Sequence, residues 1–140
     1  LHAAQWCYKN RMYQQAITIL QETIVTMVCE KTNLPIENKN ARGLVNSAFK
    51  IVFKKKQNDE DSWSLKYESR DEAVKIVREL IQLQIINDLS SSFFVATELR
   101  NDFNHAGFRD NPQTVDKIIK SIGERIQKVY NILIPQSNVH

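Results

Sequence analysis

Residues 12–31 read MYQQAITILQETIVTMVCEK, and this stretch predicts one long amphipathic helix. Its apolar side chains recur every three or four residues, the spacing that places them on one face of an α-helix; they are Met12, Ala16, Leu20, Ile24, Met27 and Val28. Pro35 ends the helix, because proline disfavours helical geometry in the residue before it. Residues 2–9 fit a shorter helix, which we expect to form an antiparallel hairpin with the long one.

Two further helices are predicted in the middle of the chain. Asn40 can cap the first of them, which we expect to run to about Lys56. Ser69 and Glu72 have the spacing of a capping box, in which each side chain satisfies a backbone donor of the other residue. The helix that starts there should end near residues 88–89.

The C-terminal third of the chain predicts two more helices. The serines at 90–92 offer a fresh N-cap or a kink in the chain. Gly107 suits the left-handed position that closes a helix. Asn111 and Pro112 read as the N-cap and first residue of a last helix that ends at Pro135. Its apolar stripe is Val115, Ile118, Ile119, Ile122, Ile126, Val129 and Leu133.

Residues 57–69 are polar and break the helical periodicity, so we expect an exposed loop or an insertion there. The acidic tip at 58–61 lacks the glycine and the ligand spacing of a calcium site, which favours a solvated loop. Trp63, Leu65 and Tyr67 can anchor this loop to the rest of the fold.

Composition indicates a single all-α domain, a helical bundle of five to six helices without a sheet. The chain has 140 residues, of which 42% are hydrophobic and 25% charged, with only three Gly and three Pro; this composition disfavours a disordered chain. The formal net charge of +3 permits an acidic partner such as RNA without implying one. Cys7 and Cys29 are too far apart for C-x-x-C chemistry, and we expect both to be buried, reduced thiols.

Other features bear on where the protein acts. No stretch approaches the roughly 18 apolar residues of a membrane span, and no signal peptide opens the chain, so we expect a cytoplasmic protein. No cofactor motif or cluster of metal ligands stands out. The sequence opens at Leu1 as though a helix had been entered partway, which suggests a domain cut from a longer protein.

One short stretch concentrates groups suited to chemistry. Arg100, Asn101 and His105 combine a fixed cation, an amide and a titratable base within six residues. Arg100-Asn101-x-x-x-His105, followed by Ala106-Gly107-Phe108, resembles the R-N-x3-H motif of HEPN domains in the CARF–HEPN ribonucleases of type III CRISPR defence. The opening of the chain resembles the first helical hairpin of those proteins, at Gln5-Trp6-Cys7-Tyr8, Tyr13-Gln14-Gln15-Ala16 and Leu20-Gln21-Glu22.

The resemblance implies metal-independent cleavage of single-stranded RNA, in which a ribose 2′-hydroxyl attacks its own 3′-phosphate. His105 suits a general base or acid because its ordinary pKa, about 6.5, lies close to neutrality. Arg100 can meet two phosphoryl oxygens with its planar fork, and Asn101 can orient His105 or the phosphate. The resemblance also implies a missing sensor domain that binds a cyclic oligoadenylate; these residues hold no glycine-rich phosphate loop of their own.

The motif is expected on the polar face of a helix, where Thr97 and Asn104 accompany it. Five positions separate Arg100 from His105, so their side chains lie about 140° apart around the helix axis. A single helix therefore does not readily direct both side chains at one phosphorus atom. We therefore expect a homodimer with a composite site at its two-fold axis, as HEPN domains are understood to form. Arg109 and Lys50 extend a phosphate-binding surface if the fold brings them near.

Three alternatives remain open from the sequence. Arg100 can simply pair with Glu98 or Asp102, while His105 caps the end of its helix. The domain can be a non-catalytic dimerisation module that binds RNA without cutting it. It can also be a HEPN toxin that acts with a separate antitoxin.

Overall fold

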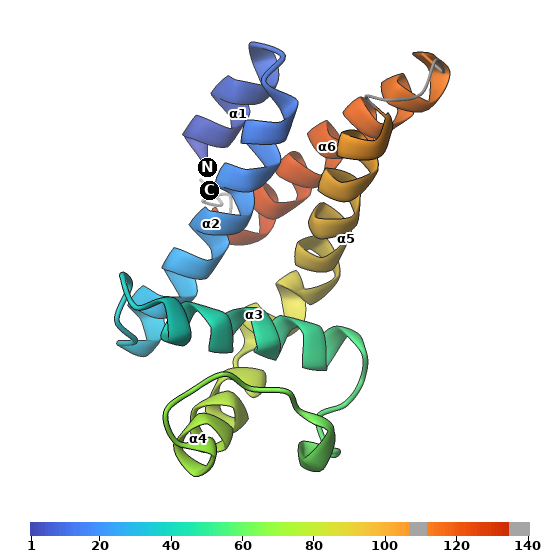
Figure 1. Ribbon diagram of the computed structural model, residues 1–140. Helices are drawn as coiled ribbons and strands as arrows, with labels where there is room; N and C mark the ends of the chain where they lie inside the picture. The colour runs from blue at the N-terminus through green and yellow to red at the C-terminus, as the bar shows by residue number, and fades with distance from the viewer. Residues whose placement is uncertain (107–111, 135–140) are drawn as a thin grey trace, which may run out of the picture. The chain divides into compact units, whose positions relative to one another are not determined.

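The computed structural model describes residues 1–106 and 112–134, and the side chains of residues 1–103 and 114–134. These residues contain six α-helices and no β-strand, which confirms the all-α prediction (Figure 1). In chain order the elements are α1 (His2–Lys9), α2 (Tyr13–Thr32), α3 (Lys39–Phe53), the 3₁₀ turn η1 (Glu60–Ser62), α4 (Arg70–Ile81), α5 (Gln84–Ala106) and α6 (Pro112–Leu133). No helix in this described part has the combination of length and apolar character needed to cross a bilayer.

The residues group into two compact units. Unit 1 combines Leu1–Glu22 with Val95–His140, and unit 2 is the intervening segment Thr23–Phe94. The chain therefore passes from one unit to the other within α2 and again within α5. The expectation of one domain stays a prediction.

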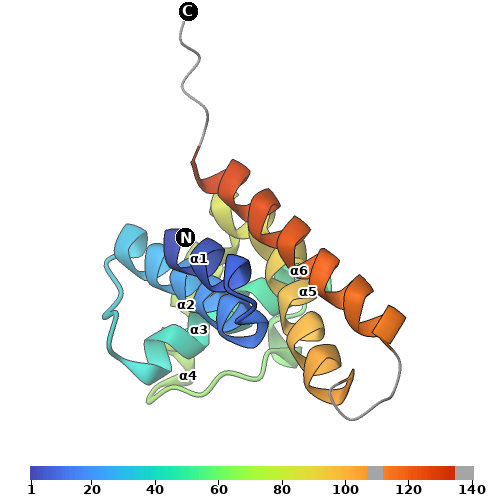
Figure 2. The same cartoon turned by 90° about the horizontal axis from the view of Figure 1, so that it is seen from above.

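In unit 1, α1 and the start of α2 form the predicted antiparallel hairpin (Figures 1 and 2). Arg11 adopts a left-handed φ of 60° just after α1. Its N–H donates to the carbonyl of Tyr8 (3.1 Å), and the N–H of Met12 donates to the carbonyl of Cys7 (2.8 Å). These two bonds are those of a Schellman motif, which satisfies the last carbonyls of a helix as the chain reverses.

The last helix packs against α1 through a glycine. A Cβ built on Gly123 of α6 would lie 2.5 Å from the Tyr8 hydroxyl oxygen, so a larger residue there would displace the end of the Tyr8 side chain. The ring of Tyr130 meets that of His2 edge to face at 6.1 Å. The most buried side chains of α6 belong to the predicted stripe, namely Ile118, Ile122, Ile126 and Val129.

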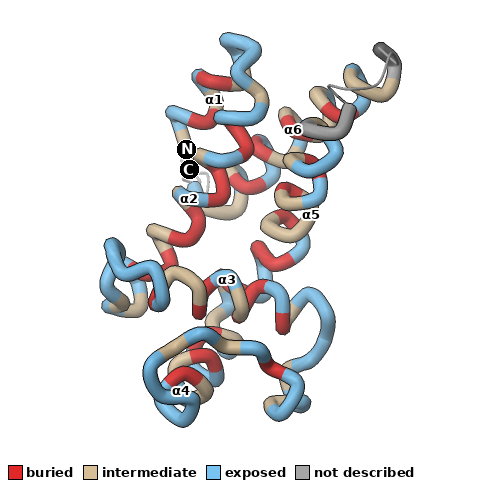
Figure 3. Tube along the Cα trace, viewed as in Figure 1, coloured by how far each residue is buried: buried red, intermediate tan, exposed pale blue. Residues whose placement is uncertain are grey.

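Unit 2 contains the second half of α2, the helices α3 and α4, which pack on each other, and the first half of α5. Along each helix the buried positions recur at helical spacing, as the coloured tube in Figure 3 shows. Phe49 is buried and stacks on Phe93 of α5, with ring centroids 4.5 Å apart. The free thiols of Cys7, in unit 1, and Cys29, in unit 2, are both buried, as predicted.

Both predicted ends of α3 were wrong. Its N-cap is Asn38 rather than Asn40, because the Asn38 side chain accepts hydrogen bonds from the backbone N–H groups of Asn40 and Ala41. The helix ends at Phe53 rather than near Lys56. Lys55 turns to a left-handed φ of 56°, and the N–H of Lys56 closes a Schellman motif on the carbonyl of Ile51.

The fourth helix is shorter than predicted. Ser69 caps it as expected, accepting from the N–H of Glu72, but α4 ends at Ile81 instead of residues 88–89. Asn87 explains the break, because its side-chain amide donates to the carbonyls of Ile81 and Leu83 and so satisfies the chain where the helix stops. The serines at 90–92 then lie within α5 and do not interrupt it.

Residues 57–69 form a loop within unit 2, and hydrogen bonds and an ion pair hold this loop in place. The Trp63 side chain is buried, and its indole N–H donates to the carbonyl of Lys56 (2.8 Å). The Arg70 guanidinium donates to the carbonyls of Trp63 (2.9 Å) and Glu60 (3.0 Å). Arg78 adds an ion pair to the Glu60 carboxylate. The loop is therefore anchored mainly by Trp63 and by arginine hydrogen bonds.

Candidate functional site

The motif lies in the second half of α5, in unit 1. Arg100 and Asn101 have described side chains there. Asn104 and His105 lie in the last turn of the same helix, and their side chains fall outside the described residues. Arg109 and Gly107 also fall outside them, so the roles predicted for these four residues stay predictions.

A buried polar contact joins α2 to α5 one turn before the motif. The side-chain amide of Gln21 donates to the hydroxyl oxygen of Thr97 at 2.6 Å. Gln21 is 7% exposed, so its amide is largely removed from water. Buried polar groups that are hydrogen-bonded hold a single arrangement of their helices, because any other arrangement leaves them unsatisfied.

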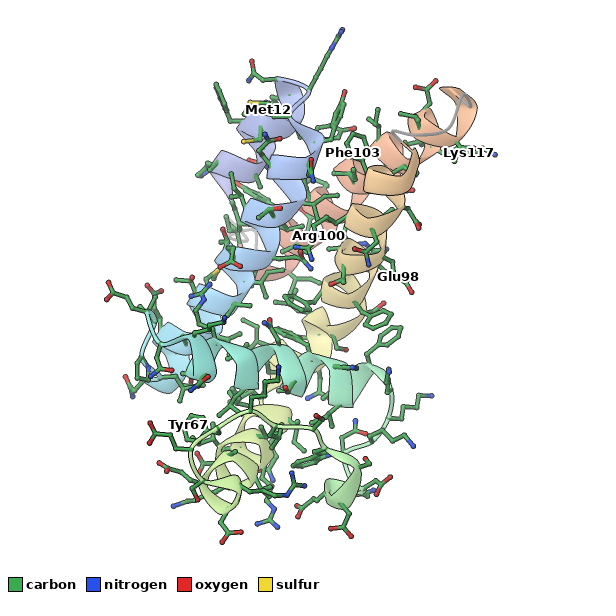
Figure 4. The ribbon with its side chains drawn as sticks, in the orientation of Figure 1. Met12, Tyr67, Glu98, Arg100, Phe103 and Lys117 are labelled. Atoms are coloured by element: carbon green, nitrogen blue, oxygen red, sulfur yellow. The ribbon has the colours of Figure 1, made fainter. Side chains whose placement is uncertain are left out.

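An aromatic contact joins the same two helices about one turn after Arg100. Tyr13 of α2 meets Phe103 of α5 edge to face, with ring centroids 6.0 Å apart. At 100° per residue, Arg100 falls between Thr97 and Phe103 around the axis of α5. Its Cα–Cβ bond is therefore directed toward the seam between α2 and α5. Figure 4 shows Arg100 on the side of α5 that faces α2, with Glu98 on the outer side.

Arg100 is half-buried in this seam. Within the described part of the chain it forms no hydrogen bond and no ion pair, including none with Glu98 or Asp102, which are both exposed. Among these residues, then, no neighbouring carboxylate on α5 neutralises Arg100, contrary to one of the alternatives left open by the sequence. A guanidinium without such partners keeps its full hydrogen-bonding capacity for a ligand.

The predicted polar face of α5 divides into two parts. Thr97 and Arg100 belong to the side in contact with α2, whereas Asn101 is exposed to solvent. Ala96 and Leu99, which belong to the predicted apolar side of α5, are buried. The polar residues thus do not form one uniformly solvated strip, and Arg100 is more enclosed than a surface arginine.

Gln21 has a role at this seam that its sequence context did not predict. Its amide sits on the buried side of α2, where helical periodicity favours an apolar side chain. A polar residue that interrupts an apolar stripe is the signal that could have revealed it. The partner on α5, Thr97, has no sequence feature that marks it as the acceptor.

Lys50 lies on α3 in unit 2 and is exposed. Among the described residues no three His, Cys, Asp or Glu side chains gather into a cluster that would bind a metal. Chemically, the described part of the site offers a half-buried cation, Arg100, and an exposed amide, Asn101. Both suit the recognition of a phosphoryl group.

Comparison with known proteins adds no further assignment: no protein-family model, curated protein or solved structure matches this chain.

Proposed function

We propose that this protein is a metal-independent endoribonuclease that cleaves single-stranded RNA, with Arg100, Asn101 and His105 as its catalytic residues. The proposal rests on the resemblance of these residues to the R-N-x3-H motif of HEPN domains. Through that resemblance it extends to the effector domain of a type III CRISPR-associated ribonuclease, governed by a cyclic oligoadenylate sensor outside these residues.

The state of Arg100 is the observation that carries the proposal. Arg100 is half-buried and has no ionic partner among the described residues, so its charge is available to a bound anion. A phosphodiester would supply that partner. The interhelical contacts of Thr97 and Phe103 on either side fix the backbone from which Arg100 projects.

The reaction begins when His105 removes the proton from a ribose 2′-hydroxyl. The 2′-oxygen attacks the adjacent phosphorus and the bond to the 5′-oxygen of the next nucleotide breaks. A proton returned to that oxygen leaves a 2′,3′-cyclic phosphate and a 5′-hydroxyl. Arg100 stabilises the additional negative charge on the phosphoryl oxygens in the transition state, and Asn101 orients the phosphate or the imidazole.

Two copies of the chain complete the site in this proposal. Arg100 and His105 project about 140° apart around α5, so a single helix directs them to different sides. A two-fold axis along this face brings a second Arg100 and His105 opposite the first pair. Each phosphate then meets residues from both copies.

The test uses labelled single-stranded RNA incubated in chelator with the wild-type chain, with His105→Ala and with Arg100→Ala. We expect cyclic-phosphate ends from the wild type and a rate at least about 100-fold lower for each variant, the lower range for a general base or an oxyanion donor. Glu98→Ala is the matched control, because Glu98 lies on the outer side of the same helix.

Two results would count against the proposal. One is cleavage by His105→Ala at the wild-type rate. The other is a dimeric wild-type chain that binds RNA and leaves it intact, which would favour the non-catalytic dimerisation module instead. Circular dichroism of each variant separates lost catalysis from lost folding.

A further inference from the structure

A basic groove lies within unit 2, between the C-terminal half of α3 and the loop that follows it. Its volume is about 370 Å³. Ser47, Lys50 and Lys54 line it from α3, and Lys56, Trp63 and Ser64 line it from the loop. We call this surface the α3 groove.

The loop wall of the α3 groove is held in place by hydrogen bonds. The indole N–H of Trp63 donates to the carbonyl of Lys56, and Arg70 donates to the carbonyl of Trp63. Trp63 is 4% exposed, so its ring packs as part of the interior of unit 2. The groove is therefore preformed, which lowers the conformational cost of binding a ligand there.

The charges of the α3 groove are largely uncompensated. Lys50 and Lys54 are exposed and form no ion pair or hydrogen bond through their side chains within the described residues. Lys56 lies 3.9 Å from the carboxylate of Asp59, and its charge is partly balanced. The nearby Glu60 carboxylate pairs with Arg78, so it repels an incoming anion only weakly. The groove thus favours a phosphate-bearing ligand.

An exposed aromatic ring flanks the same lysines. Phe53 is 38% exposed, and its other face stacks on Phe94 with ring centroids 4.1 Å apart and planes inclined by 10°. Lys50 and Phe53 of α3 and the C-cap residue Lys54 stand at positions i, i+3 and i+4, so they are neighbours on one surface at the end of the helix. Alternating cations and an open aromatic face are the pattern of surfaces that hold single strands, where phosphates meet lysine and unpaired bases stack on the ring.

We propose that the α3 groove and Phe53 bind single-stranded RNA, with the backbone phosphates on Lys50 and Lys54 and one base stacked on Phe53. The choice of RNA rests on the proposed nuclease function. The preference for a single strand does not, because a base within a duplex is already stacked and cannot lie on Phe53. The site is a binding surface that holds substrate on the chain and takes no part in bond breaking.

The test measures binding in place of cleavage, so that the two proposals fail separately. Fluorescence anisotropy follows a labelled single-stranded RNA on the His105→Ala chain, which leaves the RNA intact under the proposed mechanism. Lys50→Glu with Lys54→Glu should weaken binding at least about tenfold and flatten the dependence of log affinity on log salt by about 1.4, or about 0.7 for each phosphate that a lysine no longer neutralises. Lys39→Glu with Lys75→Glu, which changes the same charge on exposed residues elsewhere in unit 2, should have little effect.

Phe53→Leu tests the stacking step. Leucine keeps an apolar contact with Phe94 but lacks the aromatic face. We expect the affinity for the single strand to fall about 5- to 100-fold, the range for removal of one base stack, while the affinity for an RNA duplex stays unchanged. Thermal unfolding of each variant shows that the fold is retained.

Three outcomes would overturn the inference while leaving the nuclease proposal standing: equally weakened binding in both lysine pairs, equally weakened duplex and single-strand binding in Phe53→Leu, or wild-type affinity in Lys50→Glu with Lys54→Glu. Preferential binding of anionic lipid vesicles over RNA would overturn it as well. Conversely, a chain that binds RNA through the α3 groove and never cuts it would support the inference and refute the proposed nuclease activity.

Discussion

The side-chain amide of Gln21 donates a 2.6 Å hydrogen bond to the hydroxyl oxygen of Thr97, and this bond joins α2 to α5 one helical turn before Arg100. Because Arg100 lies between Thr97 and Phe103 around α5, any rotation of that helix would redirect it. The bond therefore links the stability of unit 1 to the orientation of the candidate catalytic cation.

Thr97→Val should lower the free energy of unfolding by about 1–3 kcal/mol, because it leaves the buried Gln21 amide without its acceptor. Adding Gln21→Leu should recover most of that stability, since replacing both partners with apolar groups removes the unsatisfied donor. Urea denaturation of the wild type, both single variants and the double variant measures this coupling. Destabilisations that simply add in the double variant would show that the bond contributes no stability of its own.

Gly43 and Gly123 should respond differently to alanine. Gly43→Ala adds a methyl group where nothing lies within 4 Å, and we expect a gain of about 0.5–1 kcal/mol from helix propensity. Gly123→Ala places a methyl group against the end of the Tyr8 side chain, which must shift, and we expect this displacement to offset the propensity gain and leave the variant less stable than Gly43→Ala.

Thermal unfolding compares the two glycine variants directly. The effect of Gly123→Ala on stability should be more favourable in a Tyr8→Leu chain than in the wild type, because the ring that meets the new methyl group is gone. A Gly123→Ala variant as stable as Gly43→Ala would show that the Tyr8 side chain does not oppose a methyl group at this position.

The Glu60–Arg78 pair should make the free energy of unfolding depend on pH. The hydrogen bond from Arg78 holds the pKa of the Glu60 carboxyl below its ordinary value. A depressed carboxyl pKa stabilises the fold above the unfolded value, and this contribution is lost as the pH falls through the folded value. We expect Glu60→Gln to unfold more easily than the wild type at pH 7, and the difference to vanish well below about pH 4. A difference that is constant from about pH 7 to about pH 3 would assign it to packing instead of charge.

A composite site makes activity depend on concentration. If two copies complete each site, the RNA cleavage rate per chain should fall about tenfold for each tenfold dilution once the concentration lies well below the dimer dissociation constant. Sedimentation at the same concentrations measures the share of dimer. Undiminished activity of a chain shown to be monomeric would refute the composite site.

Helix formation was largely predictable from local sequence, because periodicity and capping act over a few residues. Residues 2–9 are the bounds of α1, and α2 differs from its prediction by one residue at each end. Two of the errors, at the start of α3 and the end of α4, arose where two asparagines compete to cap one helix and where Asn87 caps a break from several residues away.

The candidate site shows the same division between local and tertiary information. The sequence by itself determined that Arg100 and Asn101 are adjacent on one helix and diverge by about 100°, because residue spacing sets the angle between side chains on a helix. Only the tertiary structure decided that Arg100 is half-buried between two contacts with α2 while Asn101 faces solvent. Those contacts join residues far apart in the chain, and the packing of Gln21 and Tyr13 against α5 selects which side of that helix is enclosed.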